Sequence, residues 1–127
     1  MKIAKEKLLL YAVTDRAWTG EKTLEEQIEE TLEAGTTFLQ LREKHLSKEE
    51  FLKEAKQVKK ITEKYNVPLI INDNVEVAVE SGADGVHVGQ SDMEAGNVRA
   101  ILGADKILGV TAKTVEQAKL AEERGAD

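Results

Sequence analysis

The chain has 127 residues, enough for one domain and too few for two, and its 41% hydrophobic and 33% charged residues indicate a globular protein rather than a disordered one. A formal net charge of −6 argues against a broad nucleic-acid surface, and the lack of cysteine excludes disulfides and thiolate chemistry. The longest apolar run is far shorter than a membrane span, so we expect a soluble, cytoplasmic protein.

Short apolar runs alternate with amphipathic helical patterns along the chain. The runs show little polar alternation at their starts, as expected for parallel strands that are covered on both faces. The predicted strands are Leu8 to Thr14, Thr36 to Arg42, Pro68 to Asn72, Gly85 to Gly89 and Lys106 to Val110.

Start signals precede three of the helical patterns. Thr23, Ser47 and Thr114 are each followed three residues later by Glu or Gln, which predicts capping boxes that satisfy free backbone amides. The helix after Ser47 has the clearest apolar face, formed by Phe51, Leu52, Ala55, Val58, Ile61, Thr62 and Tyr65.

The tripeptide Gly-Ala-Asp occurs three times, at residues 82–84, 103–105 and 125–127, with its glycine at a predicted helix end. The first two copies lead into predicted strands. Repeated strand-helix units with short connections indicate a parallel sheet, either an open doubly wound sheet or a closed barrel. Five units are present, whereas a (β/α)₈ barrel has eight and needs about 200 to 250 residues. We therefore predict an α/β fold of the TIM-barrel type, present as a single incomplete barrel domain over residues 1–127.

Polar side chains gather where the predicted strands end. In both parallel architectures the functional site lies at the carboxyl ends of the strands. The residues at these ends are Thr14, Asp15, Gln40, Arg42, Lys44, Asn72, Asp73, His87, Gln90, Asp92 and Thr111.

The second predicted strand carries the most informative row. Alternate residues of a strand share a face, so Gln40, Arg42 and Lys44 lie on one face while Leu41 and Glu43 take the other. A guanidinium fork and an ammonium in one row suit an anion with several oxygens. We predict a phosphate or diphosphate ligand at this end of the strand.

Two carboxylates near this row suit a metal. Mg²⁺ is usually held by one or two carboxylates together with substrate phosphates and water, and we assign it to Asp73 and Asp92. Either aspartate could instead cap the helix that follows it. The cations on the neighbouring strand favour the metal.

Each of three further polar residues has two possible roles. Asn72 can donate its amide to a phosphate oxygen or close an Asx turn. We expect His87 to be a hydrogen-bonded core residue rather than a general base, with Gly89 leaving room for a ligand ring. Thr111 can bind an anion or simply begin a turn. No triad, P-loop or dinucleotide-binding motif is present, so nucleophilic catalysis and dinucleotide binding are poorly supported.

Five segments of the chain carry a family resemblance, namely Tyr11 to Asp15, Gln40 to Lys44, Ile71 to Asp73, Gly85 to Asp92 and Gly109 to Thr111. In order and spacing they resemble the thiamine-phosphate synthase family, over essentially the whole chain. Members of that family are (β/α)₈ barrels that join hydroxymethylpyrimidine diphosphate to a thiazole phosphate and release diphosphate with Mg²⁺.

The resemblance implies roles for individual residues. It puts Asp73 and Asp92 on Mg²⁺ and gives catalytic roles to Arg42, Lys44 and Thr111. Thr111 replaces the usual serine of the family, which keeps the hydroxyl but adds a methyl group that can change the rotamer. The residues implied in substrate binding are Gln40, Leu41, Arg42, Glu43, Lys44, Asn72, His87 and Thr111.

The family's second half, which holds the thiazole phosphate, has no counterpart in this sequence. We therefore expect an N-terminal fragment that binds the pyrimidine diphosphate weakly and does not complete the reaction alone. Its unpaired strand edges predict self-association, pairing with a complementary chain, or partial disorder near residues 106 to 127. Two alternatives remain, a related thiazole tautomerase barrel and a non-catalytic phosphate-binding or assembly module.

Overall fold

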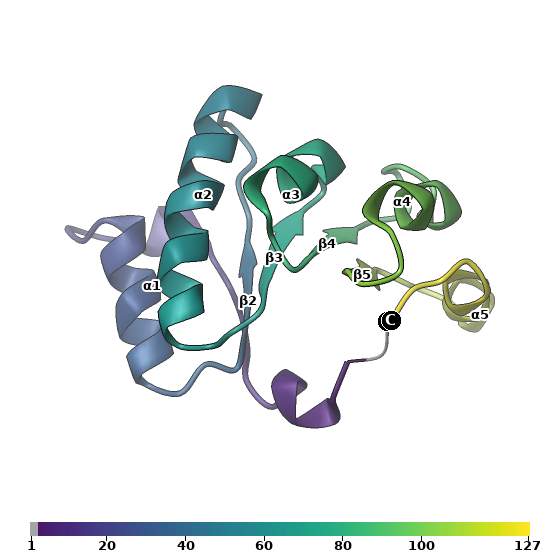
Figure 1. Ribbon diagram of the computed structural model, residues 1–127, viewed down its shortest axis with the longest axis horizontal. Helices are drawn as coiled ribbons and strands as arrows, with labels where there is room; N and C mark the ends of the chain where they lie inside the picture. Colours follow the sequence, from purple (N-terminus) through teal and green to yellow (C-terminus); the bar gives the residue numbers. More distant parts are fainter. Residues whose placement is uncertain (1–2) are drawn as a thin grey trace.

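The protein folds into a parallel sheet whose strands lie side by side in chain order (Figure 1). The computed structural model describes residues 3–127. All five predicted strands are confirmed, with shorter bounds. They are β1 (Tyr11–Val13), β2 (Phe38–Leu41), β3 (Leu69–Asn72), β4 (Gly85–Val88) and β5 (Ile107–Val110).

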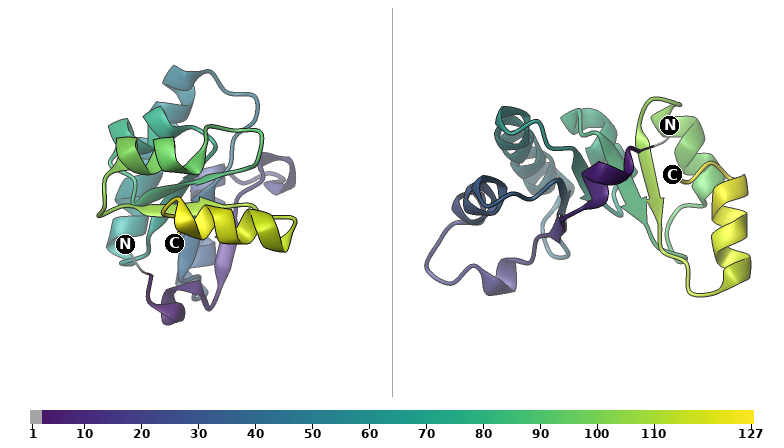
Figure 2. Two further views of the ribbon diagram at one scale, coloured as in Figure 1. Left: turned by 90° about the vertical axis from the view of Figure 1, so that its right-hand side faces the viewer. Right: turned by 90° about the horizontal axis from the view of Figure 1, so that it is seen from below.

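The α-helices lie along one side of the sheet, and the N-terminal segment lies on the other (Figures 1 and 2). A doubly wound sheet would carry helices on both faces, so the one-sided arrangement and the sequential strand order are those of a barrel wall. Within residues 3–127, no helix is both long enough and apolar enough to cross a membrane. The helices are η1 (Lys5–Leu8), η2 (Arg16–Trp18), α1 (Leu24–Glu33), α2 (Lys48–Lys64), α3 (Val75–Ser81), α4 (Ala95–Leu102) and α5 (Val115–Glu123).

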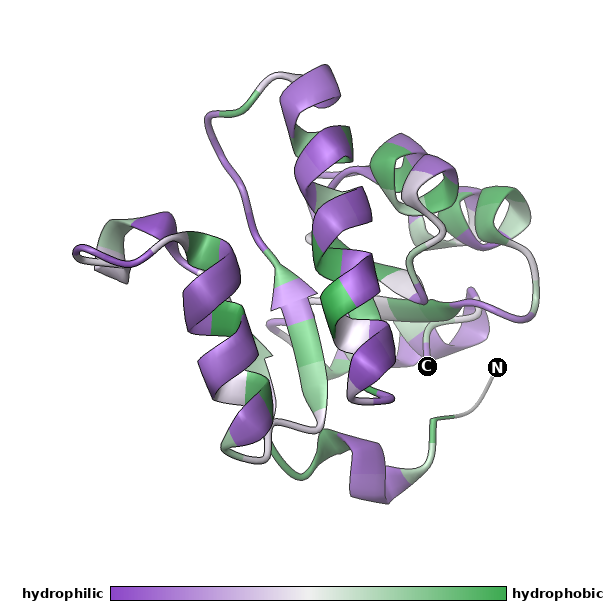
Figure 3. Ribbon diagram, turned by 60° about the vertical axis from the view of Figure 1, so that its left-hand side comes forward, coloured by the Kyte–Doolittle hydropathy of each residue, from purple (hydrophilic) through white to green (hydrophobic). Residues whose placement is uncertain are grey.

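The two faces of the sheet bury different residues. The outer face packs against the helices in one large core, to which β2 contributes Leu39 and Leu41. The inner face has a small cluster of Phe38, Ile70 and Ile107. Figure 3 shows a largely hydrophobic strand between helices along which hydrophilic and hydrophobic residues alternate. The predicted alternation along β2 is therefore confirmed.

The start of the first strand differs from the prediction. Residues 8–10 were expected to be extended, but η1 ends at Leu8 and β1 begins only at Tyr11. The Thr37 hydroxyl accepts a hydrogen bond from the Leu10 N–H at 2.9 Å and donates to the Lys7 carbonyl at 2.8 Å. These bonds hold the chain in a turn before β1, which accounts for the shorter strand.

The predicted helix starts are correct, but only one is a complete capping box. Thr23, Ser47 and Thr114 each accept a hydrogen bond from the N–H three residues later. Only Ser47 also receives the reciprocal bond, in which its own N–H donates to Glu50. The carboxamide oxygen of Gln117 accepts from the Lys113 N–H instead, so the predicted box at Thr114 is only half formed.

Two copies of the Gly-Ala-Asp tripeptide are hydrogen-bonded in the same way to the strand that precedes them in the chain. The Asp84 N–H donates to the Leu69 carbonyl, and Asp84 Oδ2 accepts from the Leu69 N–H, both at 2.8 Å. Asp127 makes the same two bonds with Leu108, at 2.8 and 2.9 Å. Each aspartate therefore acts as a clamp on the strand that precedes it.

A basic side chain from a helix completes each clamp. Lys59 Nζ lies 2.9 Å from Asp84 Oδ2, and Arg99 Nη2 lies 2.7 Å from Asp127 Oδ2. The middle copy, residues 103–105, is different, because β5 begins two residues after Asp105. Asp105 is exposed, and its side chain makes no hydrogen bond within the described part of the chain.

Replacing Asp84 with alanine tests the clamp. The buried Leu69 N–H loses its acceptor and Lys59 loses its closest carboxylate, so we expect the free energy of unfolding to fall by about 2 kcal/mol. The matched variant Asp105→Ala alters the same tripeptide outside any clamp, and we expect a change within about 0.5 kcal/mol. Urea denaturation of both variants measures the difference, and equal stabilities would contradict the clamp.

Candidate functional site

Polar side chains from four neighbouring strands meet at the carboxyl edge of the sheet. Lys44 Nζ, beyond β2, lies 2.6 Å from Asp73 Oδ2, just after β3. Asp92, after β4, lies close enough to Asp73 to influence the pKa of its carboxyl group. His87 Nε2, on β4, lies 2.8 Å from Thr111 Oγ1 after β5. The structure thus brings together the residues predicted to bind an anion and a metal.

Asp73 does not cap the helix that follows it. Its backbone is left-handed, with φ of 65°, a conformation that Asp and Asn tolerate better than most residues. Its N–H donates to the His87 carbonyl at 2.8 Å, which ties this turn to β4. Asn74 caps α3 instead, by accepting from the Val77 N–H at 3.0 Å. The capping alternative is therefore wrong for Asp73.

The capping alternative is also wrong for Asp92. Glu94 is the N-cap of α4, and Asp92 Oδ2 accepts a hydrogen bond from the Gly89 N–H at 2.6 Å. A Cβ atom at Gly89 would lie 3.1 Å from the same carboxylate oxygen. The small residue at position 89 therefore lets the chain turn closely around Asp92, and the ligand ring expected beside Gly89 has no support in this geometry.

The two aspartates form an oxygen-rich pair with one adjacent cation. Burial alone would raise the pKa of Asp73, but the Lys44 ammonium, together with a contribution from the nearby Asp92, holds that pKa below its usual value. Asp73 is therefore ionised at neutral and mildly acidic pH. Such a hard donor pair fits a divalent cation that also binds phosphate oxygens. No group of three or more acidic, His or Cys side chains within residues 3–127 could hold a metal, so the remaining ligands would come from substrate and water.

His87 is neutral and packed against β5. Burial lowers its pKa, although the charges of Asp73 and Asp92 act in the opposite direction. Gly109 is the register partner of His87, and any Cβ atom there would collide with the imidazole ring. The expected hydrogen-bonded His87 is confirmed by its contact with Thr111.

Asn72 has a buried donor that lacks an acceptor. Its side chain is 7% exposed, and within residues 3–127 Nδ2 has no hydrogen-bond partner. A buried polar group without a partner costs about 1–3 kcal/mol. Asn72 pairs in register with His87 on β4, so this donor lies beside the edge described above. An oxygen of a bound anion would satisfy it.

The inner face of β2 ends in one fixed amide and one unpaired cation. Gln40 is buried, and its Nε2 donates to the Tyr11 hydroxyl at 2.8 Å. Tyr11, whose role the sequence did not reveal, has its pKa raised by burial. The Arg42 backbone N–H donates to Thr14 Oγ1 at 3.0 Å. Its guanidinium makes no hydrogen bond or ion pair with any described residue, so this fork is available to an anion.

Two residues of the predicted binding segment point away from this edge. The Leu41 side chain is 0% exposed in the outer core, so it cannot contact a ligand as the family resemblance implied. Glu43 pairs with Arg16 on the helix side of the sheet. Neither Arg16 nor its second partner, Glu54, was predicted from the sequence. The available signal was a glutamate within the apolar face of α2.

Comparison with known proteins identifies the family. The model of the TMP-TENI family, described as thiamine monophosphate synthase, matches residues 10–127. The chain belongs to this family. It is 56% identical over 118 residues to the thiamine-phosphate synthase of Ruminiclostridium cellulolyticum, which covers 93% of this chain and 56% of the relative. It is 52% identical to the thiamine-phosphate synthase of Clostridium botulinum, over 93% of this chain and 55% of the relative.

A solved structure in the same family supports the fold. The thiamine phosphate pyrophosphorylase from Pyrococcus furiosus superposes with a TM-score of 0.87 and 34% identity, over 95% of this chain and 58% of that one. The predicted membership of the thiamine-phosphate synthase family is thus confirmed. The chain spans about half the length of the curated relatives it matches.

Proposed function

We propose that this chain forms the pyrimidine-diphosphate side of a thiamine-phosphate synthase, a transferase that moves a pyrimidinylmethyl group onto a thiazole phosphate. The observation that carries the proposal is the contact of Lys44, Asp73 and Asp92 at the strand ends of a member of this family. A module whose polar rim only capped helices would use the two aspartates as caps, and neither is one.

The diphosphate would lie across the ends of β2 and β3. The free Arg42 guanidinium supplies a fork for two oxygens, and Lys44 supplies a point charge. Asn72 Nδ2 would donate to a third oxygen and so lose its buried, unsatisfied state. Binding would also draw Lys44 away from Asp73, which exchanges one anionic partner for another.

Asp73, released in this way, and the neighbouring Asp92 would hold Mg²⁺. When bound, Mg²⁺ stabilises the negative charge that develops on the departing diphosphate. Asp73 and Asp92 lie close together and fit this ion, with diphosphate and water as its other ligands.

The reaction itself needs no protein nucleophile. The bond between the pyrimidine methylene carbon and the diphosphate oxygen breaks, and its electron pair leaves with the oxygen. The thiazole nitrogen then gives its lone pair to the methylene carbon and becomes the thiazolium nitrogen. Arg42 and Lys44 would stabilise the leaving charge, and the Thr111 hydroxyl is held at the same edge by His87.

We also propose that further strands cover the open edges of this sheet. Within residues 3–127, β1 and β5 each pair with one strand only. On β1, Tyr11 and Val13 remain 37% and 51% exposed. A complementary chain or a second copy that supplies strands would cover this surface and complete a barrel.

Titration calorimetry with inorganic pyrophosphate tests the proposed site directly. We expect the 127-residue chain to bind pyrophosphate at least about tenfold more tightly with Mg²⁺ than with a chelator, because the aspartate pair binds the anion only through a cation. Equal binding in both buffers, or none with Mg²⁺, would contradict the proposed site.

A further inference from the structure

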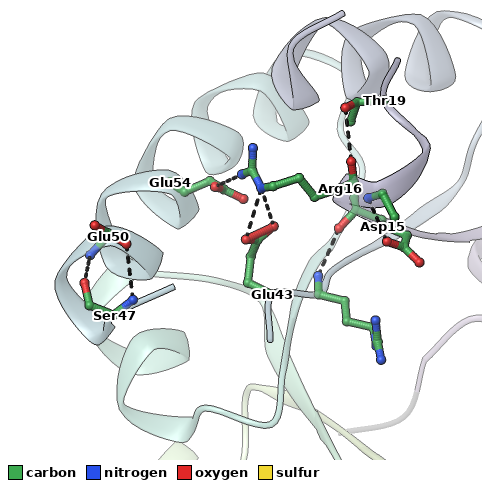
Figure 4. A network of polar contacts seen from close by, with 10 residues as sticks. Asp15, Arg16, Thr19, Glu43, Ser47, Glu50 and Glu54 are labelled. Atoms are coloured by element: carbon green, nitrogen blue, oxygen red, sulfur yellow. Dashed lines mark hydrogen bonds and ion pairs between the residues drawn. The ribbon is translucent and has the colours of Figure 1, made fainter. Parts of the chain in front are cut away.

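Arg16 lies between two buried carboxylates next to the proposed diphosphate-binding segment (Figure 4). Its Nε lies 3.2 and 3.3 Å from the two Glu43 oxygens, and its Nη2 lies 2.5 Å from Glu54 Oε2. The Glu43 and Glu54 side chains are only 4% and 9% exposed, whereas that of Arg16 is 52% exposed. One cation from η2 therefore serves two buried carboxylates.

The cluster has more negative than positive charge. Glu54 Oε1 is buried and has no hydrogen-bond partner in the described part of the chain. Burial first, and then the charges of Glu43 and Glu25, raise the pKa of Glu54 to about 7, although Arg16 acts to lower it. One arginine is thus shared by two carboxylates, and a proton on Glu54 compensates for the missing second cation near neutral pH.

Glu43 connects this cluster to the candidate site. It stands between Arg42 and Lys44, the two cations proposed for the diphosphate. Successive residues of an extended segment point to opposite sides, so a Glu43 side chain fixed on the helix side turns its neighbours toward the inner edge. The segment has another tie in the bond from the Arg42 N–H to Thr14. The Lys44 side chain is also paired with Asp73, but the proposed anion would take Lys44 from that pair. The ion pair between Arg16 and Glu43 is the side-chain tie that would remain when the anion binds.

We propose that Arg16 is a positioning residue, which acts through Glu43 and Glu54 to fix residues 42–44 so that Arg42 and Lys44 converge on the anion. The identity of that anion rests on the proposed function. How firmly residues 42–44 are held does not depend on that function, so the backbone order of this segment is measured first, without any ligand.

Backbone order in Arg16→Met is the first measurement. We expect the heteronuclear {¹H}–¹⁵N NOE of residues 42–45 to fall to values typical of a flexible loop, while the sheet residues keep theirs. Lys22→Met is the matched control, because the Lys22 side chain is also 52% exposed but pairs with an exposed carboxylate, Glu30. Unchanged NOE values at residues 42–45 in a folded Arg16→Met would overturn the proposal. If Arg16→Met does not fold, Glu43→Gln removes the same ion pair and gives the same test.

A pH profile separates positioning from simple structural support. Above pH 7 the ionised Glu54 competes with Glu43 for Arg16, so we expect the amide shifts of residues 42–44 to titrate with a midpoint near 7. The measurement is made in a His45→Gln background, which leaves no imidazole in or beside this segment. Glu54→Gln should remove this titration, and a step that persists in it would overturn the proposal. Between about pH 4.5 and 7 the folded chain holds a proton that the unfolded chain lacks, so stability falls as the pH rises through this range.

Pyrophosphate binding with Mg²⁺ is the last measurement. We expect about tenfold weaker binding in Arg16→Met, a loss typical of groups that orient the residues contacting a ligand, and wild-type affinity in Lys22→Met. Undiminished affinity in Arg16→Met would overturn the positioning role. A wild-type chain with an ordered segment and no pyrophosphate binding would instead overturn the proposed function, while the NOE and pH results would still decide the role of Arg16.

Discussion

Gly85→Ala is expected to lower the free energy of unfolding by about 3 kcal/mol, the upper range for overpacking a well-filled interior. A Cβ atom at this position would collide with the Ile107 carbonyl oxygen and lie 2.7 Å from Ile107 Cβ and 2.8 Å from its carbonyl carbon. Most of these atoms belong to the backbone of β5, so no side-chain rotation relieves the clash. β5 would have to move away from β4, and their ladder would weaken.

The matched substitution Gly96→Ala should have the opposite sign. Gly96 lies in α4, where a Cβ atom would approach only the flexible Glu94 carboxylate, at 3.1 Å. Replacing a helical glycine with alanine typically stabilises by about 0.5–1 kcal/mol, so we expect no loss. Urea denaturation of both variants provides the comparison. A Gly85→Ala variant as stable as Gly96→Ala would show that the two strands separate more easily than their packing indicates.

The strands were predictable because each contributes residues to a buried face. Leu69 and Ile71 lie in the outer core, and Ile70 lies in the inner cluster, so the apolar run from residue 69 to 71 had no polar position. The start of β1 was not predictable in the same way. The leucines that precede β1 lead into a turn that is held by the Thr37 hydroxyl. Thr37 lies 27 residues from Leu10, so this contact leaves no periodic pattern in the sequence.

The sequence alone also could not decide whether an aspartate caps the helix that follows it. Asp73 and Asn74 are adjacent and chemically similar, so the sequence could not say which one caps α3. The left-handed backbone of Asp73 decides it, because the turn directs the Asp73 carboxylate to Lys44 and leaves Asn74 at the helix start. Likewise, Arg16 and Glu54 are separated by 38 residues, and only the fold brings them together.

Asp73→Asn is expected to weaken Mg²⁺-dependent pyrophosphate binding by at least about 100-fold, the upper range for losing a group that supports a metal site. The substitution removes one of the two carboxylates proposed to hold the ion. Asparagine tolerates the left-handed backbone at this position as well as aspartate does, so the turn after β3 should be kept. Asp105→Asn makes the same charge change at an exposed position away from this edge and should bind as the wild type does.

The same variant should bind pyrophosphate more tightly when the metal is removed. In the wild type, Lys44 is paired with Asp73 at 2.6 Å, and both side chains are partly exposed, 42% and 35%. Breaking such an exposed ion pair costs less than about 1 kcal/mol. In the variant the Lys44 ammonium is no longer paired with Asp73, so this cost is absent when pyrophosphate binds. We therefore expect pyrophosphate to bind about two- to fivefold more tightly in a chelator, which corresponds to the free energy of an exposed ion pair. Calorimetry in both buffers would then show affinities that change in opposite directions. A parallel loss in both would mean that Asp73 acts by holding Lys44 in place rather than by binding the cation.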